Sequence, residues 1–115
     1  MNAAEASAVF RALGDPMRLE VLQILGAADG ASATALADRL PITRQGVTKH
    51  VAVLSNAGLV ESEARGRAVI YRVRPNVAAE AAQWLDRAGA AWDARLDRLR
   101  QHLEGTRTTR EGDPS

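Results

Sequence analysis

Residues 34–73 hold several structural signals in an unbroken order, and that order restricts the fold more than any other feature of the chain. A short amphipathic segment ends at Pro41, and a second segment, rich in polar side chains, begins after a turn. Two runs with strand-like alternation follow, joined through Gly66. A helix, a turn, a second helix and a hairpin in this order predict a winged helix-turn-helix, a shape that fits the grooves of duplex DNA.

Two further helices are predicted before this stretch. Residues 3–13 read as a helix that ends at Gly14. A second helix is expected to begin at Asp15-Pro16, because aspartate caps free amides and proline is tolerated in the first turn of a helix. We expect the core-facing residues of this helix to be Leu19, Leu22, Ile24 and Leu25. Residues 26–31, GAADGA, are predicted to form a loop.

The two helices of the predicted motif have recognisable starts and a recognisable turn. Ser32 is expected to cap the first helix through its hydroxyl, and Thr43 is expected to cap the second. Ile42 is the apolar residue that a helix-turn-helix turn requires, where it fixes the angle between the helices. In the second helix the residues that recur at i, i+4 and i+7, and therefore face the core, are Val47, Val51 and Leu54.

The opposite side of this second helix is polar. It presents Arg44, Gln45, Thr48 and Lys49. Arginine pairs bidentately with guanine and glutamine with adenine, whereas threonine and lysine more often hold phosphate. The face occupies the position that inserts into DNA, so a DNA contact is favoured over an ordinary solvated surface. Thr43 is included among the expected DNA-binding residues. His50 is either a phosphate contact or a local structural hydrogen bond, and the residues leave both open.

The hairpin is predicted to have strands at 59–65 and 67–73. The residues that alternate as in a half-buried second strand are Val69, Tyr71 and Val73. Arg65 and Arg67 flank the glycine at the tip. A narrow minor groove attracts inserted cations, so we expect these two arginines to reach the groove or its flanking phosphates, in preference to a merely solvated tip.

The net charge of +1 conceals an uneven distribution. Residues 39–74 carry seven bases against two acids, a local charge of +5, whereas residues 1–38 carry −3 and residues 75–115 carry −1. The basic excess therefore lies on the predicted helix-turn-helix and hairpin, where DNA phosphates would lie.

A long helix is predicted from Val77 to about Leu103. Its apolar residues recur every three or four positions, at Val77, Ala81, Trp84, Ala88, Trp92, Leu96, Leu99 and Leu103. A stripe of this length exceeds what a small domain can cover, and a core with few aromatic residues often needs a partner subunit. We expect a mainly α fold with a small β-hairpin over residues 1–104, serving DNA binding and dimerisation, and a disordered tail over 105–115.

Composition argues against several other classes. The chain has no cysteine, which removes disulfides and thiolate metal sites. An enzyme has no support, since the sequence shows no phosphate-cradling glycine loop and no metal-ligand cluster, and its two histidines are far apart. No cofactor or metal is therefore expected. No long apolar run and no leader segment is evident, so the cytoplasm is the expected compartment.

Two small groups of residues have competing interpretations. Trp84 and Trp92 could line a small-molecule pocket, but their helical spacing favours packing. His102 with Glu104 could hold a metal at a subunit edge, but a polar helix end is favoured, because a structural zinc site needs about four ligands. The sequence does not identify a small-molecule effector.

Three segments together resemble the arsenic-repressor-like (ArsR) family of bacterial winged helix-turn-helix regulators. They are LGDPMRLEVLQIL, TALADRLPITRQGVTKHVAVLSNAGLV and ARGRAVIYRV, and the similarity covers roughly residues 8–103. Many relatives carry Cys-x-Cys in the helix that here reads ATALADRL, where Ala35, Leu36 and Ala37 cannot bind a soft metal. The chain is therefore similar to the subgroup without metal-binding cysteines.

The resemblance implies a homodimer in which the first and last helices form the interface and the second helix of the motif enters the major groove. The residues it assigns to dimerisation or the adjoining core are Val9, Phe10, Trp84, Trp92, Leu96 and Leu99. It also implies repression by occupying a promoter, on a pseudo-palindromic operator in double-stranded DNA. A winged-helix scaffold that binds another protein instead of DNA is the alternative, and the isolated surface cations favour DNA over it.

Overall fold

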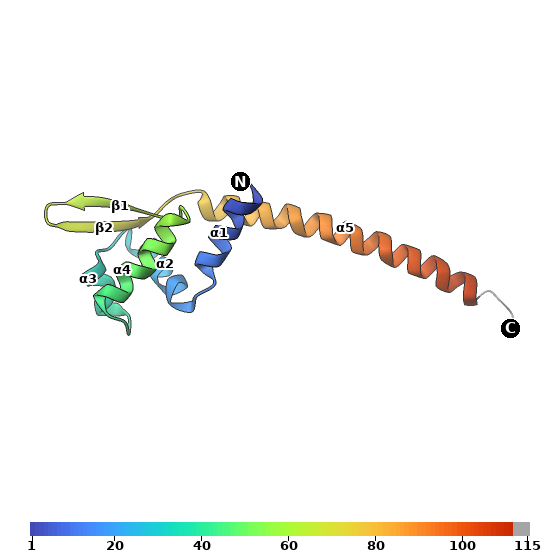
Figure 1. The fold of residues 1–115 in the computed structure, drawn as a ribbon, viewed down its shortest axis with the longest axis horizontal. Helices are drawn as coiled ribbons and strands as arrows, with labels where there is room; N and C mark the ends of the chain where they lie inside the picture. The colour runs from blue at the N-terminus through green and yellow to red at the C-terminus, as the bar shows by residue number, and fades with distance from the viewer. Residues whose placement is uncertain (112–115) are drawn as a thin grey trace. The chain divides into compact units, whose positions relative to one another are not determined.

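The computed structural model describes the backbone of residues 1–111 and the side chains of residues 1–104. Its elements follow the predicted order (Figure 1), and they are α1 (Ala3–Leu13), α2 (Pro16–Ala28), α3 (Ala33–Arg39), α4 (Arg44–Asn56), β1 (Val60–Arg65), β2 (Ala68–Val73) and α5 (Val77–Glu111). The predicted tail is residues 105–115. The side chains of these residues are not described, and neither is the backbone of residues 112–115. The tail therefore stays a prediction.

Side-chain caps begin the helices that carry the motif. The Asp15 carboxylate accepts hydrogen bonds from the backbone N–H groups of Met17 at 2.8 Å and Arg18 at 3.1 Å. The Ser32 hydroxyl caps α3, and the Thr43 hydroxyl caps α4, accepting from the amides three residues ahead at 3.1 and 3.0 Å. All three predicted caps are confirmed, and each satisfies an amide that a helix start leaves without a partner.

The predicted loop over residues 26–31 is wrong in its first half. Helix α2 continues through Gly26 to Ala28 and ends at Asp29, which takes the left-handed conformation with φ 54°. Two alanines after the glycine favour the helix, and a helical glycine is unfavourable by only about 1 kcal/mol. Gly30, with φ 108°, then turns the chain so tightly against β2 that an added Cβ would lie 3.0 Å from Cγ of Arg72.

One of the four predicted core residues of α2 faces away from the core. Leu19 is 49% exposed, whereas Val21 and Leu25 are buried. Positions 21 and 25 are one helical turn apart, and Leu19 lies about 200° around the helix from Val21, on the opposite side. Helix α2 is apolar on more than one side, so its periodicity alone did not identify the buried side.

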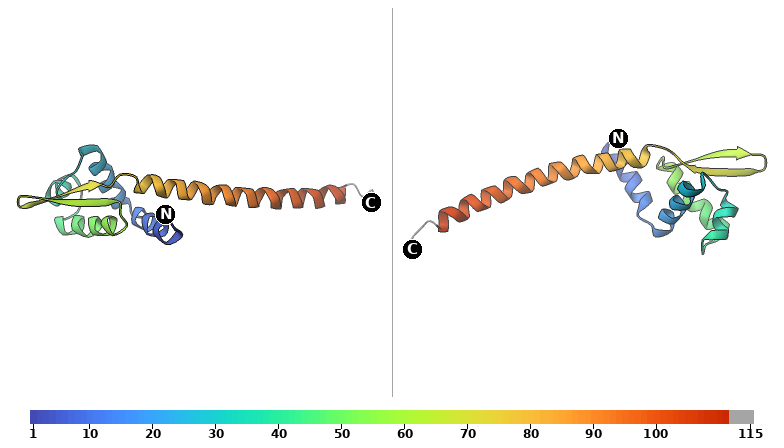
Figure 2. Two further views of the ribbon diagram at one scale, coloured as in Figure 1. Left: turned by 90° about the horizontal axis from the view of Figure 1, so that it is seen from above. Right: turned by 180° about the vertical axis from the view of Figure 1, so that it is seen from behind.

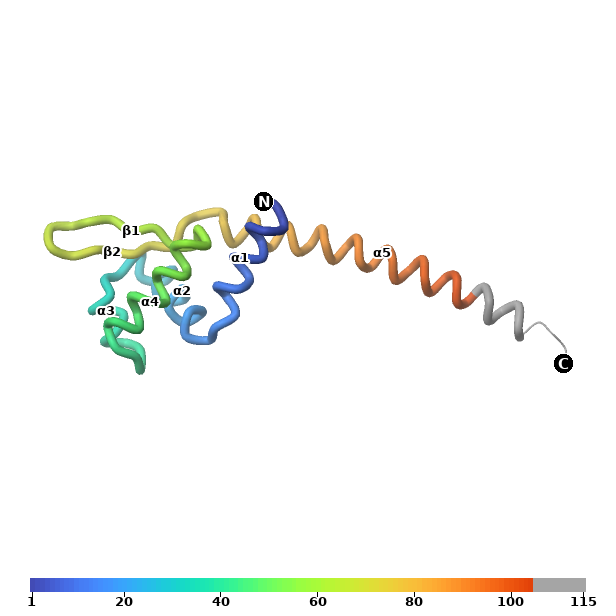
Figure 3. The backbone as a smooth tube through the Cα atoms, viewed as in Figure 1, coloured from blue at the N-terminus to red at the C-terminus, as the bar shows by residue number. Residues whose placement is uncertain are grey.

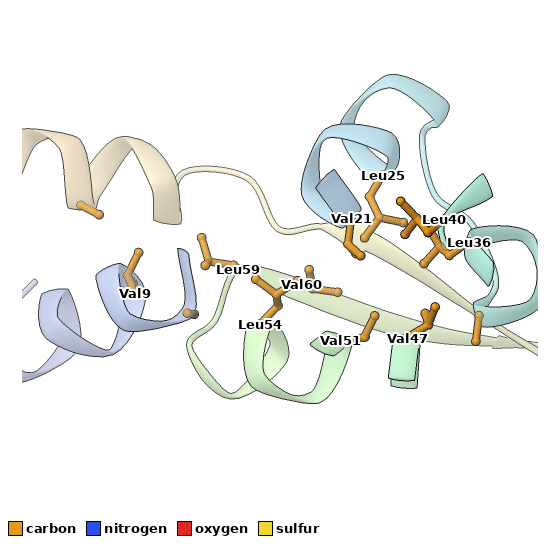
Figure 4. Close-up of a cluster of buried hydrophobic side chains, with 13 residues drawn as sticks. Val9, Val21, Leu25, Leu36, Leu40, Val47, Val51, Leu54, Leu59 and Val60 are labelled. Carbon is orange, nitrogen blue, oxygen red and sulfur yellow. The ribbon is translucent and has the colours of Figure 1, made fainter. Parts of the chain in front are cut away.

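The described residues divide into two compact units, of which the first is Met1–Ala81 and the second begins at Ala82. The first unit has a single hydrophobic core, to which α1, α2, α3, α4, β1 and the start of α5 contribute. Figure 4 shows Val21, Leu25 and Leu36 from α2 and α3 together with Val47, Val51 and Leu54 from α4. The predicted inward face of α4 is therefore confirmed, which leaves the opposite side of that helix to solvent.

The hairpin is an antiparallel pair in which Val60 lies opposite Val73 and Arg65 opposite Ala68. Its strands agree with the predicted ones to within a residue at each end. An isolated bridge between Ala31 and Tyr71 ties the loop after α2 to the outer edge of β2. Tyr71 and Val73 are half-buried as predicted, but Val69 is 43% exposed.

The second unit is formed by the remainder of α5, whose continuous helical backbone can be followed in Figures 2 and 3. The large apolar residues that this helix exposes are Leu85, Trp92, Leu96, Leu99 and Leu103. Within the described part of the chain, no helix is both long and apolar enough to cross a membrane.

Candidate nucleic-acid interface

The first two turns of α4 form an exposed polar surface. Arg44, Gln45, Thr48 and Lys49 together line one open hollow. All four are exposed, because Val47 and Val51 on the same helix are buried in the core and fix its rotation. The structure therefore brings together the four residues that the sequence assigned to the centre of the interface.

Two threonines at this end of α4 use their hydroxyls within the helix. The Thr43 oxygen accepts the hydrogen bond from the backbone N–H of Gly46 at 3.0 Å. The Thr48 hydroxyl donates to the carbonyl oxygen of Arg44 at 3.0 Å. Thr48 thus offers a methyl group and an acceptor oxygen outward, which suits a base edge better than a phosphate. Thr43 acts first as a helix cap, although its side chain remains exposed.

A cleft separates the start of α4 from the hairpin. It has a volume of about 500 Å³, and its lining includes Thr34 of α3, Arg44 and Thr48 of α4, and Arg67 beside the hairpin tip. Arg44 also lines the hollow on the outer face of α4, so it lies between the two concavities. The sequence located Arg67 at the tip but gave no indication that it would share a cleft with Arg44.

His50 is half-buried and does not line either hollow. Its charge is one of the causes that lower the pKa of the Asp15 carboxyl, after the leading hydrogen bond from the Arg18 N–H. His50 is therefore close enough to Asp15, at the start of α2, for the two charges to interact. This position is compatible with the local structural role, and the phosphate contact stays a prediction.

The hairpin carries an ion cluster that sequence reasoning missed. The Glu63 carboxylate accepts a hydrogen bond from the Arg72 guanidinium, and its other oxygen lies 4.0 Å from Nε of Arg65. The bond from Arg72 is the main cause that holds the pKa of the Glu63 carboxyl below its ordinary value of 4.5, and the same bond raises the pKa of Arg72. Part of the local positive charge is therefore compensated within the hairpin.

The residues that the resemblance assigned to dimerisation fall into two groups. Val9 is 1% exposed and packs within the core of its own chain, so it belongs to the adjoining core. Phe10 and Trp84 are half-buried. The exposed ones are Trp92, Leu96 and Leu99. His102 and Glu104 are exposed, and among the described residues no group of three or more histidines or carboxylates could hold a metal ion.

A capped helix-turn-helix, a hairpin beside it and a shared cationic cleft define a DNA-binding protein of the winged helix-turn-helix class. Residues 13–63 match the family described as a helix-turn-helix domain. The HTH-type transcriptional regulator YuzN of Bacillus subtilis (strain 168), which is described as uncharacterized, is 40% identical over 72 residues, covering 57% of this chain and 75% of that protein. The transcriptional repressor SdpR of the same organism is 25% identical over 77 residues, covering 67% and 84% respectively.

Solved structures agree with these relatives. An ArsR-like transcriptional regulator from Rhodococcus sp. RHA1 is similar with a TM-score of 0.77 and 45% sequence identity, over 85% of this chain and 92% of that one. The chain belongs to the ArsR family of winged helix-turn-helix transcriptional regulators, within which it lacks cysteine. It is a DNA-binding regulator, and the family and fold class expected from its sequence are confirmed.

Proposed function

We propose that the protein is a homodimeric repressor that occupies a pseudo-palindromic operator. The observation that carries this proposal is the exposed polar surface of α4 beside the cleft that it shares with Arg67. A surface of this width and polarity suits the major groove, and the cleft beside it suits the phosphate backbone. The similarity to a protein described as a transcriptional repressor supports repression over activation. Such a protein acts on cytoplasmic DNA.

The dimer is proposed from the exposed apolar stripe of α5. Trp92, Leu96, Leu99 and Leu103 recur at steps of four, three and four, and each is at least 36% exposed. This spacing is that of a seam between two packed helices, and a contiguous apolar surface of this length marks an interaction site. A second copy of the chain offers the matching stripe. Two-fold symmetry would then place two α4 helices on half-sites about one helical turn apart.

Individual roles follow from position. We assign discrimination between bases to Arg44, Gln45 and Thr48, which project from the first turns of α4. Lys49 on the same surface, together with Arg65 and Arg67 of the hairpin, would hold phosphates, because lysine and arginine at such edges act mainly as counter-charges. Thr43 would contribute through its cap, by fixing the start of α4.

Fluorescence anisotropy with duplexes from the region upstream of the gene, and with single-base variants of an inverted repeat found there, tests the proposal. Arg44→Ala should flatten the discrimination between variants. Arg67→Ala should weaken binding to every sequence alike and reduce the salt slope by about 1, since each neutralised phosphate contributes about 0.9. Equal effects of both substitutions on every sequence would contradict the assigned roles. A wild-type protein that binds no duplex at low salt would contradict the function.

A further inference from the structure

The two faces of the hairpin differ in chemistry. Pairing of β1 with β2 places Glu61 opposite Arg72, Glu63 opposite Ile70 and Arg65 opposite Ala68. Alternation along a strand puts these residues on one face of the hairpin, which we call the outer face. Val60 and Tyr71, on the other face, are buried or half-buried. The outer face therefore carries acids and bases in equal number, whereas Arg67 lines the cleft on the side of α4.

Arg72 is fixed at both ends of its side chain. Its stem lies against the loop at Gly30, where an added Cβ would come within 3.0 Å of Cγ. Its guanidinium donates to Glu63, and the charges of Asp29 and Glu61 also act on it. The Arg72 side chain is 26% exposed, against 62% for Arg65. Arg72 is thus held within the fold, and Arg65 is the outer-face cation that has room to reach DNA.

Glu63 stands between these two cations. One oxygen is bound by Arg72, and the other lies 4.0 Å from Nε of Arg65, where the pair is exposed to solvent. An exposed ion pair of this kind is weak, so a phosphate could draw Arg65 away. Glu63 would then face the DNA backbone as a second anion. Whether Arg65 stays or leaves, the carboxylate offsets part of the attraction between Arg65 and phosphate.

We propose that Glu63 limits the affinity of the protein for DNA of any sequence, because it suppresses binding of Arg65 to the phosphate backbone. This inference rests on the proposed contact between the hairpin and DNA. Base-edge contacts from α4 are unaffected by Glu63, whereas sequence-independent binding depends on the number of phosphates that cations neutralise. Removal of the carboxylate charge therefore raises nonspecific affinity, and operator affinity by a similar factor.

A double-mutant cycle between positions 63 and 65 tests the proposal, with nonspecific duplex as the ligand. Glu63→Gln should steepen the salt slope by about 1, so that the affinity ratio between variant and wild type changes about fourfold between ~50 and ~200 mM salt. Arg65→Gln should weaken nonspecific binding less in the wild-type background than in the Glu63→Gln background, where it should abolish the gain. Such non-additivity is the signature of two coupled residues.

Glu61→Gln is the matched control, because it removes the same charge from the same face of the same strand. No described salt bridge joins Glu61 to Arg65 or Arg72, so its removal should change the salt slope less than Glu63→Gln does. Thermal unfolding of each variant shows whether it remains folded. A further variant, Arg72→Gln, breaks the Glu63–Arg72 pair and should not increase the affinity for DNA.

Three results would overturn the role of Glu63: an unchanged or weaker nonspecific affinity in Glu63→Gln, an equal gain in Glu61→Gln, or an equal loss from Arg65→Gln in both backgrounds. If Arg44→Ala still flattens operator discrimination in the same experiment, the proposed regulator function stands although the role of Glu63 falls. If wild-type protein binds no duplex, both are overturned.

Discussion

The Arg18 guanidinium of α2 donates from Nε to the carbonyl oxygen of Ala12 at 2.6 Å, and a second nitrogen reaches the carbonyl oxygen of Arg11 at 3.2 Å. These carbonyls belong to the last turn of α1, whose final carbonyls lack an amide four residues ahead in the helix, and that of Arg11 also accepts the backbone N–H of Gly14 at 3.1 Å. One side chain therefore closes α1 and joins it to α2. These two hydrogen bonds also explain why Arg18, although a base near the motif, does not belong to the cationic surface.

Replacement of Arg18 should destabilise the fold without direct loss of DNA affinity. We expect Arg18→Met to lower the free energy of unfolding by about 1–2 kcal/mol, because a charged donor to two carbonyls is removed while the aliphatic stem is kept. Arg18→Lys should recover only part of this, since an ammonium cannot reproduce the planar fork. Urea unfolding measures the stability. Full stability of Arg18→Met would show that the two bonds contribute nothing.

The lowered pKa of the Asp15 carboxyl predicts how the stability of the fold depends on pH. The hydrogen bond from the Arg18 N–H, followed by that from Met17, holds the pKa of the Asp15 carboxyl below its ordinary value of 3.8. When the pKa of a carboxyl is lower in the folded than in the unfolded state, its ionised form stabilises the fold at pH values above the unfolded-state pKa. This stabilisation is lost as the pH falls through the folded-state pKa. Asp15→Ala should therefore be less stable than wild type at neutral pH, and the gap should close below about pH 4.

Asp15→Asn is the matched control, because asparagine caps helices about as well as aspartate but does not titrate. Its difference from Asp15→Ala should not change with pH. Urea unfolding of the three proteins at several pH values supplies the comparison. A gap between wild type and Asp15→Ala that persists unchanged in acid would assign the cap a role independent of the carboxylate charge.

Substitutions at Thr43 distinguish its role as a helix cap from a direct contact with DNA. Thr43→Ala should lower the free energy of unfolding by about 1 kcal/mol, the usual effect of losing an N-cap hydroxyl, and Thr43→Ser should restore it. If the cap is its main contribution to the interface, Thr43→Ser should bind operator like wild type. Anisotropy measured well below the unfolding temperature checks this. An operator affinity that falls in Thr43→Ser at unchanged stability would instead indicate that the threonine methyl contacts DNA.

The sequence was sufficient for the features that depend on neighbouring residues. The caps at Asp15, Ser32 and Thr43 and the inward face of α4 follow from local patterns, and all are present. Leu19 was misplaced because α2 is apolar on more than one side, so only the packed structure identifies the buried one.

The site was predictable only where it lies on a single helix. Arg44, Gln45, Thr48 and Lys49 are brought together by helical periodicity alone. The shared cleft of Arg44 and Arg67 depends on the angle of the hairpin to α4, and the Glu63–Arg72 pair joins residues that are diagonal in the strand register. Neither relationship is encoded in local spacing. A count of charges treats all acids and bases of β1 and β2 alike, although Arg72 is held within the fold by its pair with Glu63.

The stripe on α5 gives the last prediction. Leu99 is 54% exposed and belongs to the row that we assign to the dimer seam, whereas Gln101, two positions later, is exposed on a different side of the helix. Leu99→Glu should convert the dimer to a monomer, because it would bury two like charges across a two-fold seam, and Gln101→Glu should leave the dimer intact. Analytical ultracentrifugation measures the mass.

Operator binding should follow the oligomeric state of these two variants. A monomer reaches only one half-site at a time, so Leu99→Glu should lose operator affinity far more than nonspecific affinity, while Gln101→Glu keeps both. Circular dichroism establishes that each variant is helical and folded. If wild type is already a monomer at the concentrations where it binds operator, or if Leu99→Glu remains a dimer, the seam lies elsewhere and the exposed leucines of α5 require another partner.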